Sequence, residues 1–362
     1  MYSVSIIAPR VPLRSVATEH GLPNSNQARS VTISDELQAG LPQLPDIDRR
    51  SIPPHAVEST WSAEDGHELR RIDWPGAEID GAPAGSRGSI LFFPGRGDHY
   101  EKYLETLEQW HRAGWRVTAA DWRGQAGSGR LGNDPVTGHI DDFSVWVDDL
   151  EAFWADWKSE TCGPHVLAGH SMGGHLSLRG VVDGAVDPDA LVLVAPMLGF
   201  VGRIPAAIGH GAARLMNSLG DSARPAWKWS EKPGEVPASR QKLLTHDDAR
   251  YADELWWREQ RPELVMGPGS WGWVERAYAS MRGLFEIDRL EKVETPVLLL
   301  GTSADLLVGI HAIEEAARRL PNAQLTRFGE EAAHEILREV DPVRDRAMSS
   351  IAAFLDRVAP PQ

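Results

Sequence analysis

The segment HVLAGHSMGGHLSLRGVV, which runs from His165 to Val182, decides the fold of this chain. Its first six residues predict a short buried strand, and Met172–Val182 predicts the helix that follows. Ser171 therefore stands in a sharp turn between strand and helix, within a Gly-x-Ser-x-Gly pattern. The glycines leave space for such a turn, and the helix N-terminus favours negative charge that develops beside the serine hydroxyl. The pattern is short and can arise by chance, so the neighbouring segments must decide whether Ser171 is a nucleophile.

Strand-like and helix-like runs alternate on both sides of this segment. Short apolar runs predict strands at Ser89–Gly95, Trp115–Trp122, Ala190–Pro196, Pro296–Thr302 and Gln324–Phe328. Helices are predicted at Tyr100–Ala113, Asp142–Trp157 and Ala312–Leu320, and over the final stretch of helical periodicity, Val343–Val358. Strands that alternate with helices imply a mostly parallel sheet covered on both faces. We therefore predict an α/β fold.

Two stretches interrupt this alternation. Residues 1–54 are rich in proline and lack a long periodic segment, which predicts an N-terminal extension. Residues 197–285 look irregular and are rich in Gly, Pro and Trp, which predicts a cap, or lid, inserted at the carboxyl edge of the sheet, where active sites of such folds lie. The core then consists of two parts, residues 55–196 and residues 286–362.

Composition limits the partners and the compartment. The formal net charge of −15 argues against binding to nucleic acid and against electrostatic adhesion to anionic lipid, so we expect any membrane contact to be transient, apolar and made by the cap. No apolar run reaches the length of a membrane span, and the N-terminus does not resemble a secretion signal. Cys162 is the only cysteine, which excludes an internal disulfide and favours a cytoplasmic location. The sequence does not indicate an oligomeric state.

A serine nucleophile needs a base, and the base needs a carboxylate that orients it. In hydrolase sheets of this kind the three follow the chain order Ser, acid, His. Asp305 comes three residues after the predicted strand that ends at Thr302, and His334 follows the strand QLTRF by a short loop. Both are expected at carboxyl ends of strands, in the required order. We therefore predict a catalytic triad of Ser171, Asp305 and His334.

The tetrahedral intermediate of such a reaction needs two converging N–H donors. We expect one from Met172, the residue after the nucleophile, and the other from the backbone of Arg96 in the turn FFPGRGDH. No cofactor and no metal are expected. Gly127–Gly132 matches a dinucleotide-binding pattern, but Asn133-Asp134-Pro135 follows and breaks the helix that this pattern requires. No metal-binding spacing is present in the sequence.

The motifs FPGRGDHYEKYLETLEQWHRAGWRVTAADWRGQAGSGR, GHSMGGH, GTSADLLV and AAHEIL together resemble the bacterial lysophospholipase and monoacylglycerol lipase branch of the α/β-hydrolase superfamily. The resemblance covers roughly residues 56–196 and 286–358. It implies an α/β-hydrolase fold and hydrolysis of an ester of a monoacyl lipid. The chain departs from the family at Pro94-Gly95, where the family often has His-Gly, and this removes a possible supporting histidine contact.

The cap is expected to bind the acyl chain. Within Arg203–Leu219, apolar residues recur at helical spacing, and we expect Leu215 and Leu219, together with Trp273, to contact the substrate. An alternative is that this helix packs flat on the core and that the tryptophans of the insertion form the interior of the cap.

Three other functions stay open. An aminopeptidase-like amidase of the same branch would need cap carboxylates to hold a substrate amine, and Glu231, Glu235 and Glu263 are available in the sequence. A general short-chain carboxylesterase would use the same triad. A binding protein without catalysis would have no reason to retain Asp305 and His334 in the required order.

Overall fold

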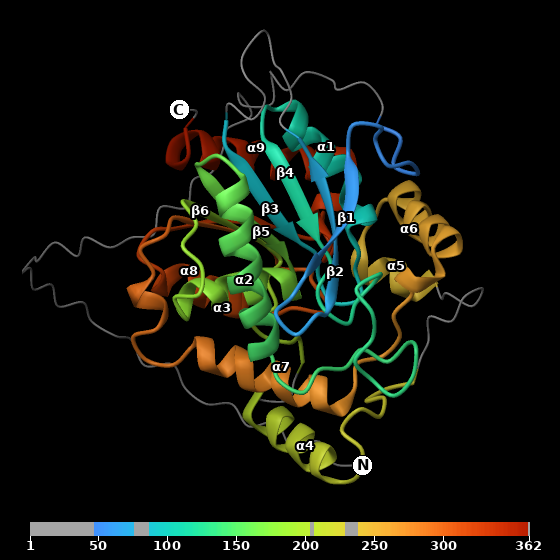
Figure 1. Ribbon diagram of the computed structural model, residues 1–362. Helices are drawn as coiled ribbons and strands as arrows, with labels where there is room; N and C mark the ends of the chain where they lie inside the picture. Colours follow the sequence, from blue (N-terminus) through green and yellow to red (C-terminus); the bar gives the residue numbers. More distant parts are fainter. Residues whose placement is uncertain (1–46, 76–86, 203–205, 229–237, 361–362) are drawn as a thin grey trace, which may run out of the picture. The chain divides into compact units, whose positions relative to one another are not determined.

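The computed structural model describes residues 47–75, 87–202, 206–228 and 238–360 (Figure 1). All of them belong to one compact unit, Ser34–Gln362. Eight strands of the described residues form one sheet in the order β1-β2-β4-β3-β5-β6-β7-β8. The strands are β1 (Val57–Ser62), β2 (Glu68–Trp74), β3 (Ser89–Phe93), β4 (Arg116–Ala120), β5 (His165–His170), β6 (Ala190–Val194), β7 (Val297–Thr302) and β8 (Ala323–Phe328). The pairs from β4 to β8 are parallel, whereas β1 and β2 run antiparallel to their neighbours.

Helices cover both faces of this sheet, as predicted (Figure 1). The helices of the core are α1 (Leu104–Arg112), α2 (Ser144–Glu160), α3 (Met172–Val182), α8 (Ile310–Arg319) and α9 (Asp341–Val358). One hydrophobic cluster joins α1 and α9 to the sheet, and a second joins α2, α3 and α8 to the opposite face. Alternate residues of a strand enter different clusters, as Phe92 and Phe93 of β3 do, because successive side chains of a strand point to opposite faces.

The insertion between β6 and β7 is mostly helical in its described part, so the prediction of an irregular segment was wrong. Its helices are α4 (Ala206–Ser218), α5 (Ala238–Leu244), α6 (Asp248–Gln260) and α7 (Trp271–Leu284). In Figure 1, α4 and α7 lie side by side at the bottom of the view, and α5 and α6 lie at its right. The apolar periodicity of α6 is weak because its buried face carries charged residues, including Arg250, Glu254 and Arg258.

The sequence also did not predict β1 and β2. Strand β1 is an edge strand whose side chains are almost all exposed, so it lacks the apolar run that marks the buried strands. Of the predicted extension, only residues 47–54 lie among the described residues; Arg49 and Arg50 both contact Asp253 of α6, at 2.6 and 2.7 Å. None of the helices in the described ranges combines the length and the apolar composition that a membrane crossing requires.

Candidate active site

Ser171 occupies a strained turn between β5 and α3. Its backbone has φ 51° and ψ −114°, a conformation that residues other than glycine rarely adopt. The surrounding packing holds this turn in place. A Cβ on Gly173 would lie 2.4 Å from both the Phe93 and the Pro94 carbonyl oxygens, so only glycine fits there. The Ser171 N–H donates to the Val194 carbonyl at 2.9 Å, which ties the turn to β6.

Asp305 and His334 come from the ends of neighbouring strands and meet in the interior. Asp305 follows β7 and His334 follows β8, and the His334 Nδ1 lies 2.6 Å from the Asp305 Oδ2. The Asp305 Oδ1 accepts hydrogen bonds from the backbone N–H groups of Leu307 and Val308, at 2.7 and 2.9 Å. Because a carboxylate can only accept, the imidazole proton sits on Nδ1, which leaves Nε2 as an acceptor.

The electrostatics of this pair suit a base and its orienting carboxylate. Burial by itself would raise the pKa of Asp305, but the charge and hydrogen bond of His334, with two backbone N–H groups, lower it below its ordinary value. Burial by itself would lower the pKa of His334, but the charge and hydrogen bond of Asp305 raise it above its ordinary value. The arrangement therefore makes His334 a stronger base than a free imidazole.

Ser171 and His334 line one cavity of about 600 Å³, which we call the Ser171 cavity. This volume lies within the range of small-molecule sites, roughly 300–1,000 Å³. Much of the lining is apolar and comes from the insertion between β6 and β7 and from the loop after β7: Met197, Phe200, Trp227, Leu243, Leu244, Met266, Trp271, Trp273, Val274, Leu307 and Val308. Two of the other predicted site residues, Arg96 and Trp273, also line it, whereas Asp305 lies behind His334.

The turn after β3 packs directly against the serine turn. A Cβ on Gly95 would lie 3.0 Å from the Ser171 Cβ, and the Gly97 N–H donates to the Gln125 Oε1 at 2.7 Å. Met172 is fully buried and begins α3 immediately after Ser171. The two predicted N–H donors, Arg96 and Met172, therefore belong to the two backbone turns that flank the serine.

The similarity to known proteins agrees with this geometry. Residues 84–341 match the family model of serine aminopeptidase, S33. The chain belongs to the S33 family. Lysophospholipase L2 of Escherichia coli is 30% identical to this S33 chain over 289 residues, which are 74% of the chain and 80% of that protein. Probable lysophospholipase L2 of Haemophilus influenzae is 26% identical over 279 residues, 75% of this chain and 84% of that protein.

Solved structures show the same fold. A soluble variant of monoglyceride lipase from Saccharomyces cerevisiae, in complex with a substrate analogue, has a TM-score of 0.68 with 18% identity, and the match covers 86% of this chain and 98% of that chain. Monoacylglycerol lipase of Paleococcus ferrophilus has a TM-score of 0.60 with 19% identity, and the match covers 80% of this chain and 99% of that chain. The predicted α/β-hydrolase fold and the predicted family resemblance are thereby confirmed, and this S33 chain is an ester-hydrolysing α/β-hydrolase.

The side chain of Arg96, to which the sequence assigned no role, links the turn after β3 to the insertion between β6 and β7 of this S33 chain. Its Nη2 donates to the Gly267 carbonyl at 2.8 Å. Its guanidinium carbon lies 5.2 Å from the centre of the Trp227 ring and 5.0 Å from that of Trp273. Cation–π contacts of this kind stabilise the packing of the insertion against the turn that carries the Arg96 backbone N–H. The sequence could not predict these contacts of Arg96, because its partners lie more than 100 residues away in the chain.

His170 hydrogen-bonds within the fold and also lines the Ser171 cavity. Its Nδ1 lies 2.8 Å from the Tyr103 hydroxyl and 3.1 Å from the Asp98 Oδ2. Its Nε2 lies 3.3 Å from the His334 carbonyl oxygen, so His170 supports the loop that carries the base. Sequence reasoning missed this link because its partners come from separate segments.

Leu215 and Leu219, which were expected to contact the substrate, lie outside the Ser171 cavity. Their exposed fractions are 58% and 59%, and neither lies among the described residues that line the Ser171 cavity. The buried face of α4 instead carries His210 and Ala213, and His210 Nε2 lies 3.0 Å from the Glu275 Oε1 of α7. Leu215 therefore lies on the opposite, solvent side of the helix, and Leu219 is exposed directly after the end of α4 at Ser218. The start of the segment that was expected to contact the substrate, residues 203–205, lies outside the described residues.

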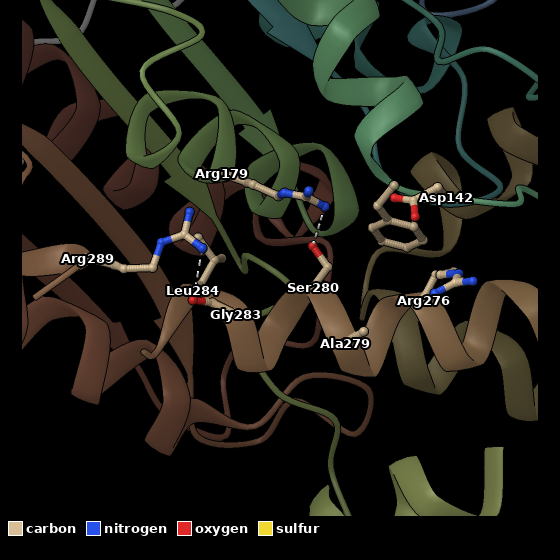
Figure 2. A pocket seen from close by; sticks show the side chains of 9 residues that line it. Asp142, Arg179, Arg276, Ala279, Ser280, Gly283, Leu284 and Arg289 are labelled. Atoms are coloured by element: carbon tan, nitrogen blue, oxygen red, sulfur yellow. Dashed lines mark hydrogen bonds between the residues drawn. The ribbon is translucent and has the colours of Figure 1, made fainter. Parts of the chain in front are cut away.

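A second pocket, of about 180 Å³, lies between α3 and α7 and is lined by Asp142, Phe143, Arg179, Arg276, Ala279, Ser280, Gly283, Leu284 and Arg289 (Figure 2). Arg179 donates to the Ser280 hydroxyl, and Arg289 donates to the Gly283 carbonyl. Asp183 forms ion pairs with both of these arginines. This pocket shares no residue with the Ser171 cavity, so it is not the candidate active site.

No binding site for a dinucleotide or a metal stands out in the described part of the chain. Gly127–Gly132 lies in a loop, and the next helix begins only at Ser144, as the sequence indicated. The described residues contain no group of three or more His, Cys, Asp or Glu side chains placed to hold a metal ion.

Proposed function

We propose that this chain hydrolyses carboxylic esters of monoacyl lipids, lysophospholipids or monoacylglycerols, through an acyl-enzyme at Ser171. The observation that carries the proposal is the Ser171 cavity, where the serine and the Asp305-paired His334 meet a largely apolar wall. Each CH₂ of a bound acyl chain gains about 0.8 kcal/mol from such a wall. The names of the similar proteins, lysophospholipase L2 and monoglyceride lipase, support the same substrate class.

In the proposed mechanism, the Ser171 oxygen attacks the ester carbonyl while His334 Nε2 takes the serine proton. The N–H groups of Arg96 and Met172 bind the oxyanion, and Asp305 stabilises the imidazolium that forms. The bond to the alcohol then breaks, and His334 returns its proton to the leaving alcohol. A water molecule, deprotonated by His334, attacks the acyl-serine, and the fatty acid leaves as the Ser171 hydroxyl forms again.

An amidase that holds a free substrate amine is less well supported. The carboxylates that line the Ser171 cavity, among the described residues, are Asp98 and Glu335. Each lies 2.5 Å from the Lys102 Nζ, so each already has a cationic partner. Glu263 does not line the cavity, and Glu231 and Glu235 lie outside the described residues. The size of the apolar wall likewise favours a long acyl chain over the acetyl group of a short-chain ester.

Residues 197–285 are proposed to act as the cap, which also meets the lipid aggregate. Ile208, Leu215, Leu219 and Trp227 of this segment are exposed, with 46–62% of each accessible to solvent. Because the chain carries a net charge of −15, an apolar surface is its means of contacting lipid. The contact is proposed to be transient and to deliver single lipid molecules. A cytoplasmic location is a further proposal, based on the single cysteine.

A substrate panel tests the proposed function. The panel contains a long-chain monoacylglycerol, a lysophospholipid with the same acyl chain, p-nitrophenyl acetate, a long-chain p-nitrophenyl ester and proline p-nitroanilide. The expected result is a kcat/KM for long-chain monoacyl esters at least tenfold above that for the acetate, with no cleavage of the anilide. Faster cleavage of the anilide than of every ester, or full activity in Ser171→Ala, would overturn the proposal.

A further inference from the structure

The turn after β3, which carries the proposed oxyanion donor Arg96, is held by hydrogen bonds on both sides of that residue. The Gly95 N–H donates to the Asp98 Oδ2 at 3.3 Å, and the Gly97 N–H donates to the Gln125 Oε1 at 2.7 Å. Both acceptors come from segments that follow β3 and β4. The peptide that carries the Arg96 N–H lies between these two anchored peptides, and the backbone angles of Gly95 and Arg96 set its orientation.

The residue before this turn gives it little further support. Pro94 has no N–H and no polar side chain, and its carbonyl accepts a hydrogen bond from the Trp122 Nε1 at 3.0 Å. A side chain that holds the peptide between Gly95 and Arg96 must therefore come from another position, and the side chain of Arg96 itself is placed to do so.

The insertion between β6 and β7 holds the far end of the Arg96 side chain. The guanidinium lies over the rings of both Trp227 and Trp273, and its Nη2 donates to the Gly267 carbonyl. A Cβ on Gly138, in the loop before α2, would lie 2.9 Å from the same Nη2. Together Trp227, Trp273, Gly267 and Gly138 form what we call the Arg96 slot.

The walls of the Arg96 slot are bonded to one another. The Gly138 N–H donates to the Pro268 carbonyl at 2.9 Å, and the Ser270 N–H donates to the Gly138 carbonyl at 2.9 Å. These bonds fix Gly138 against the insertion, so the slot holds the guanidinium in one place. Because the rotamers open to a side chain depend on the φ and ψ of its residue, a side chain fixed at its far end restricts its own backbone.

We propose that the Arg96 side chain is a positioning residue: clamped in its slot, it orients the peptide whose N–H binds the oxyanion, so that the insertion contributes to kcat and not only to substrate binding. The inference rests on the proposed function, because it assumes that an oxyanion forms beside Ser171. Loss of a whole oxyanion donor costs roughly 10²–10³-fold in kcat, and a displacement of about 1 Å can cost 10²-fold. Loss of the clamp alone leaves the donor in place but less well aligned, and its effect is correspondingly smaller.

The first test is the kinetics of Arg96→Met, which keeps most of the aliphatic stem and removes the cation and its donors. The variant should lower kcat by roughly 10–100-fold on p-nitrophenyl acetate and by the same factor on a long-chain p-nitrophenyl ester, since the oxyanion is the same for every acyl group. KM should change less than threefold. Arg96→Lys should recover part of the loss, because lysine keeps a cation for the tryptophan rings and a donor for the Gly267 carbonyl.

Arg276→Met is the matched control. Arg276 lies on α7 of the insertion and also donates to a backbone carbonyl outside it, that of Asp141, at 2.8 Å, but it does not line the Ser171 cavity. This variant should keep kcat on both esters, which shows that losing a link between the insertion and the rest of the chain is not by itself enough.

A pair of inhibitors separates a positioning role from a structural one. A long-chain trifluoromethyl ketone reacts with a serine nucleophile to give a tetrahedral oxyanion, whereas the corresponding alcohol occupies the same cavity without reacting. In Arg96→Met the Ki of the ketone should rise by the factor by which kcat/KM falls, and the Ki of the alcohol should change less than threefold. An equal rise for both inhibitors would mean that Arg96 shapes the cavity and does not position the oxyanion donor.

A double-mutant cycle with Trp227 tests the clamp itself. Trp227 is 46% exposed, so Trp227→Leu is expected to fold, and it should lower kcat roughly 3–10-fold on both esters by removing one ring contact of the guanidinium. In the Arg96→Met background the same change should cause no further loss. Where Arg96→Met does not fold, Arg96→Lys takes its place in the cycle. Losses that simply add would show that Trp227 acts independently of Arg96 and would overturn the clamp.

The remaining outcomes separate this inference from the proposed function. Unchanged kcat in folded Arg96→Met, or a loss confined to the long-chain ester, would overturn the positioning role while leaving ester hydrolysis at Ser171 intact. An unaltered protein that cleaves none of the esters, or a Ser171→Ala variant with full activity, would overturn the proposed function and the inference with it.

Discussion

The Nδ1 of His334 lies 2.6 Å from the Oδ2 of Asp305, and both side chains are almost completely buried. The other carboxylate oxygen of Asp305 is held by two backbone N–H groups, so the carboxylate cannot rotate away without breaking three hydrogen bonds. This contact determines which imidazole nitrogen carries the proton and keeps Nε2 as the acceptor.

Asp305→Asn should lower kcat by roughly 10⁴-fold, because an amide in place of the carboxylate favours the wrong tautomer of His334. The pH profile should also change. Asp305 raises the pKa of His334 above its ordinary value of 6.5, and the base must be neutral, so kcat/KM of the unaltered protein should rise with pH through a midpoint above 6.5. Without the carboxylate of residue 305, burial lowers the pKa of His334 and only the charges of Glu335 and Asp98 oppose it, so the midpoint should move to lower pH. An unchanged midpoint in a folded variant would mean that Asp305 does not act on the base.

Ser171→Ala should lower kcat by roughly 10⁶-fold on every ester, because the nucleophile is lost while the cavity remains. A fluorophosphonate should add once to the unaltered protein and not to the variant, as intact-mass spectrometry can show. Ser159→Ala, which changes an exposed serine at the end of α2, is the matched control and should keep both activity and labelling. A peptide that carries the label at a residue other than Ser171 would refute the assignment.

Gly173→Ala should unfold the protein or lower its Tm strongly, since the added Cβ would lie 2.4 Å from two backbone carbonyl oxygens that cannot move independently. Gly211→Ala is the contrasting change. Gly211 lies within α4 with no atom within 4 Å of the added Cβ, and alanine favours a helix over glycine by about 1 kcal/mol. Thermal unfolding of both variants checks the prediction. Equal melting temperatures for the two would show that the serine turn tolerates a side chain.

Leu215→Glu combined with Leu219→Glu should leave Tm and the hydrolysis of p-nitrophenyl acetate almost unchanged, because both leucines, Leu215 on α4 and Leu219 directly after it, are exposed and neither lines the Ser171 cavity. The double variant should be several-fold slower on a long-chain monoacylglycerol presented in vesicles, if α4 contacts the lipid surface. Ile287→Glu, at an exposed apolar residue outside the cap helices, should not have this effect. Equal rates on vesicles for all three proteins would rule out α4 as the contact.

The predictable part of the candidate site depends on local patterns and on one topological rule. Ser171 was recognisable because a strand, a glycine-flanked serine and a helix follow one another within 18 residues. Asp305 was recognisable because it follows the buried apolar strand β7, and His334 because it follows the next strand, β8; the carboxyl ends of parallel strands share one edge of the sheet. Their contact in the structure agrees with that expectation, whereas their roles in catalysis stay a prediction.

The cap was less predictable for a physical reason. The apolar stripe of α4, which includes Leu215, was expected to face the substrate. The face of α4 that packs on α7 instead carries Gly209, His210 and Ala213. Small residues and a paired histidine allow a close helix contact as well as leucines do, so hydrophobicity alone did not reveal the orientation. On α6, a buried carboxylate surrounded by cations replaces the apolar contacts that a periodicity search detects.

The sequence by itself determined the alternation of strands and helices, the position of the serine turn and the chain order of the candidate triad, because these features depend on neighbouring residues and on the rules that connect parallel strands. Only the tertiary structure decided which side chains surround the serine. Arg96 contacts tryptophans of the cap, His170 contacts the loop of His334, and helices α5 and α6 bring two arginines to the cavity. These contacts join segments that lie far apart in the chain, and their geometry follows from how the cap packs on the core, which no local pattern encodes.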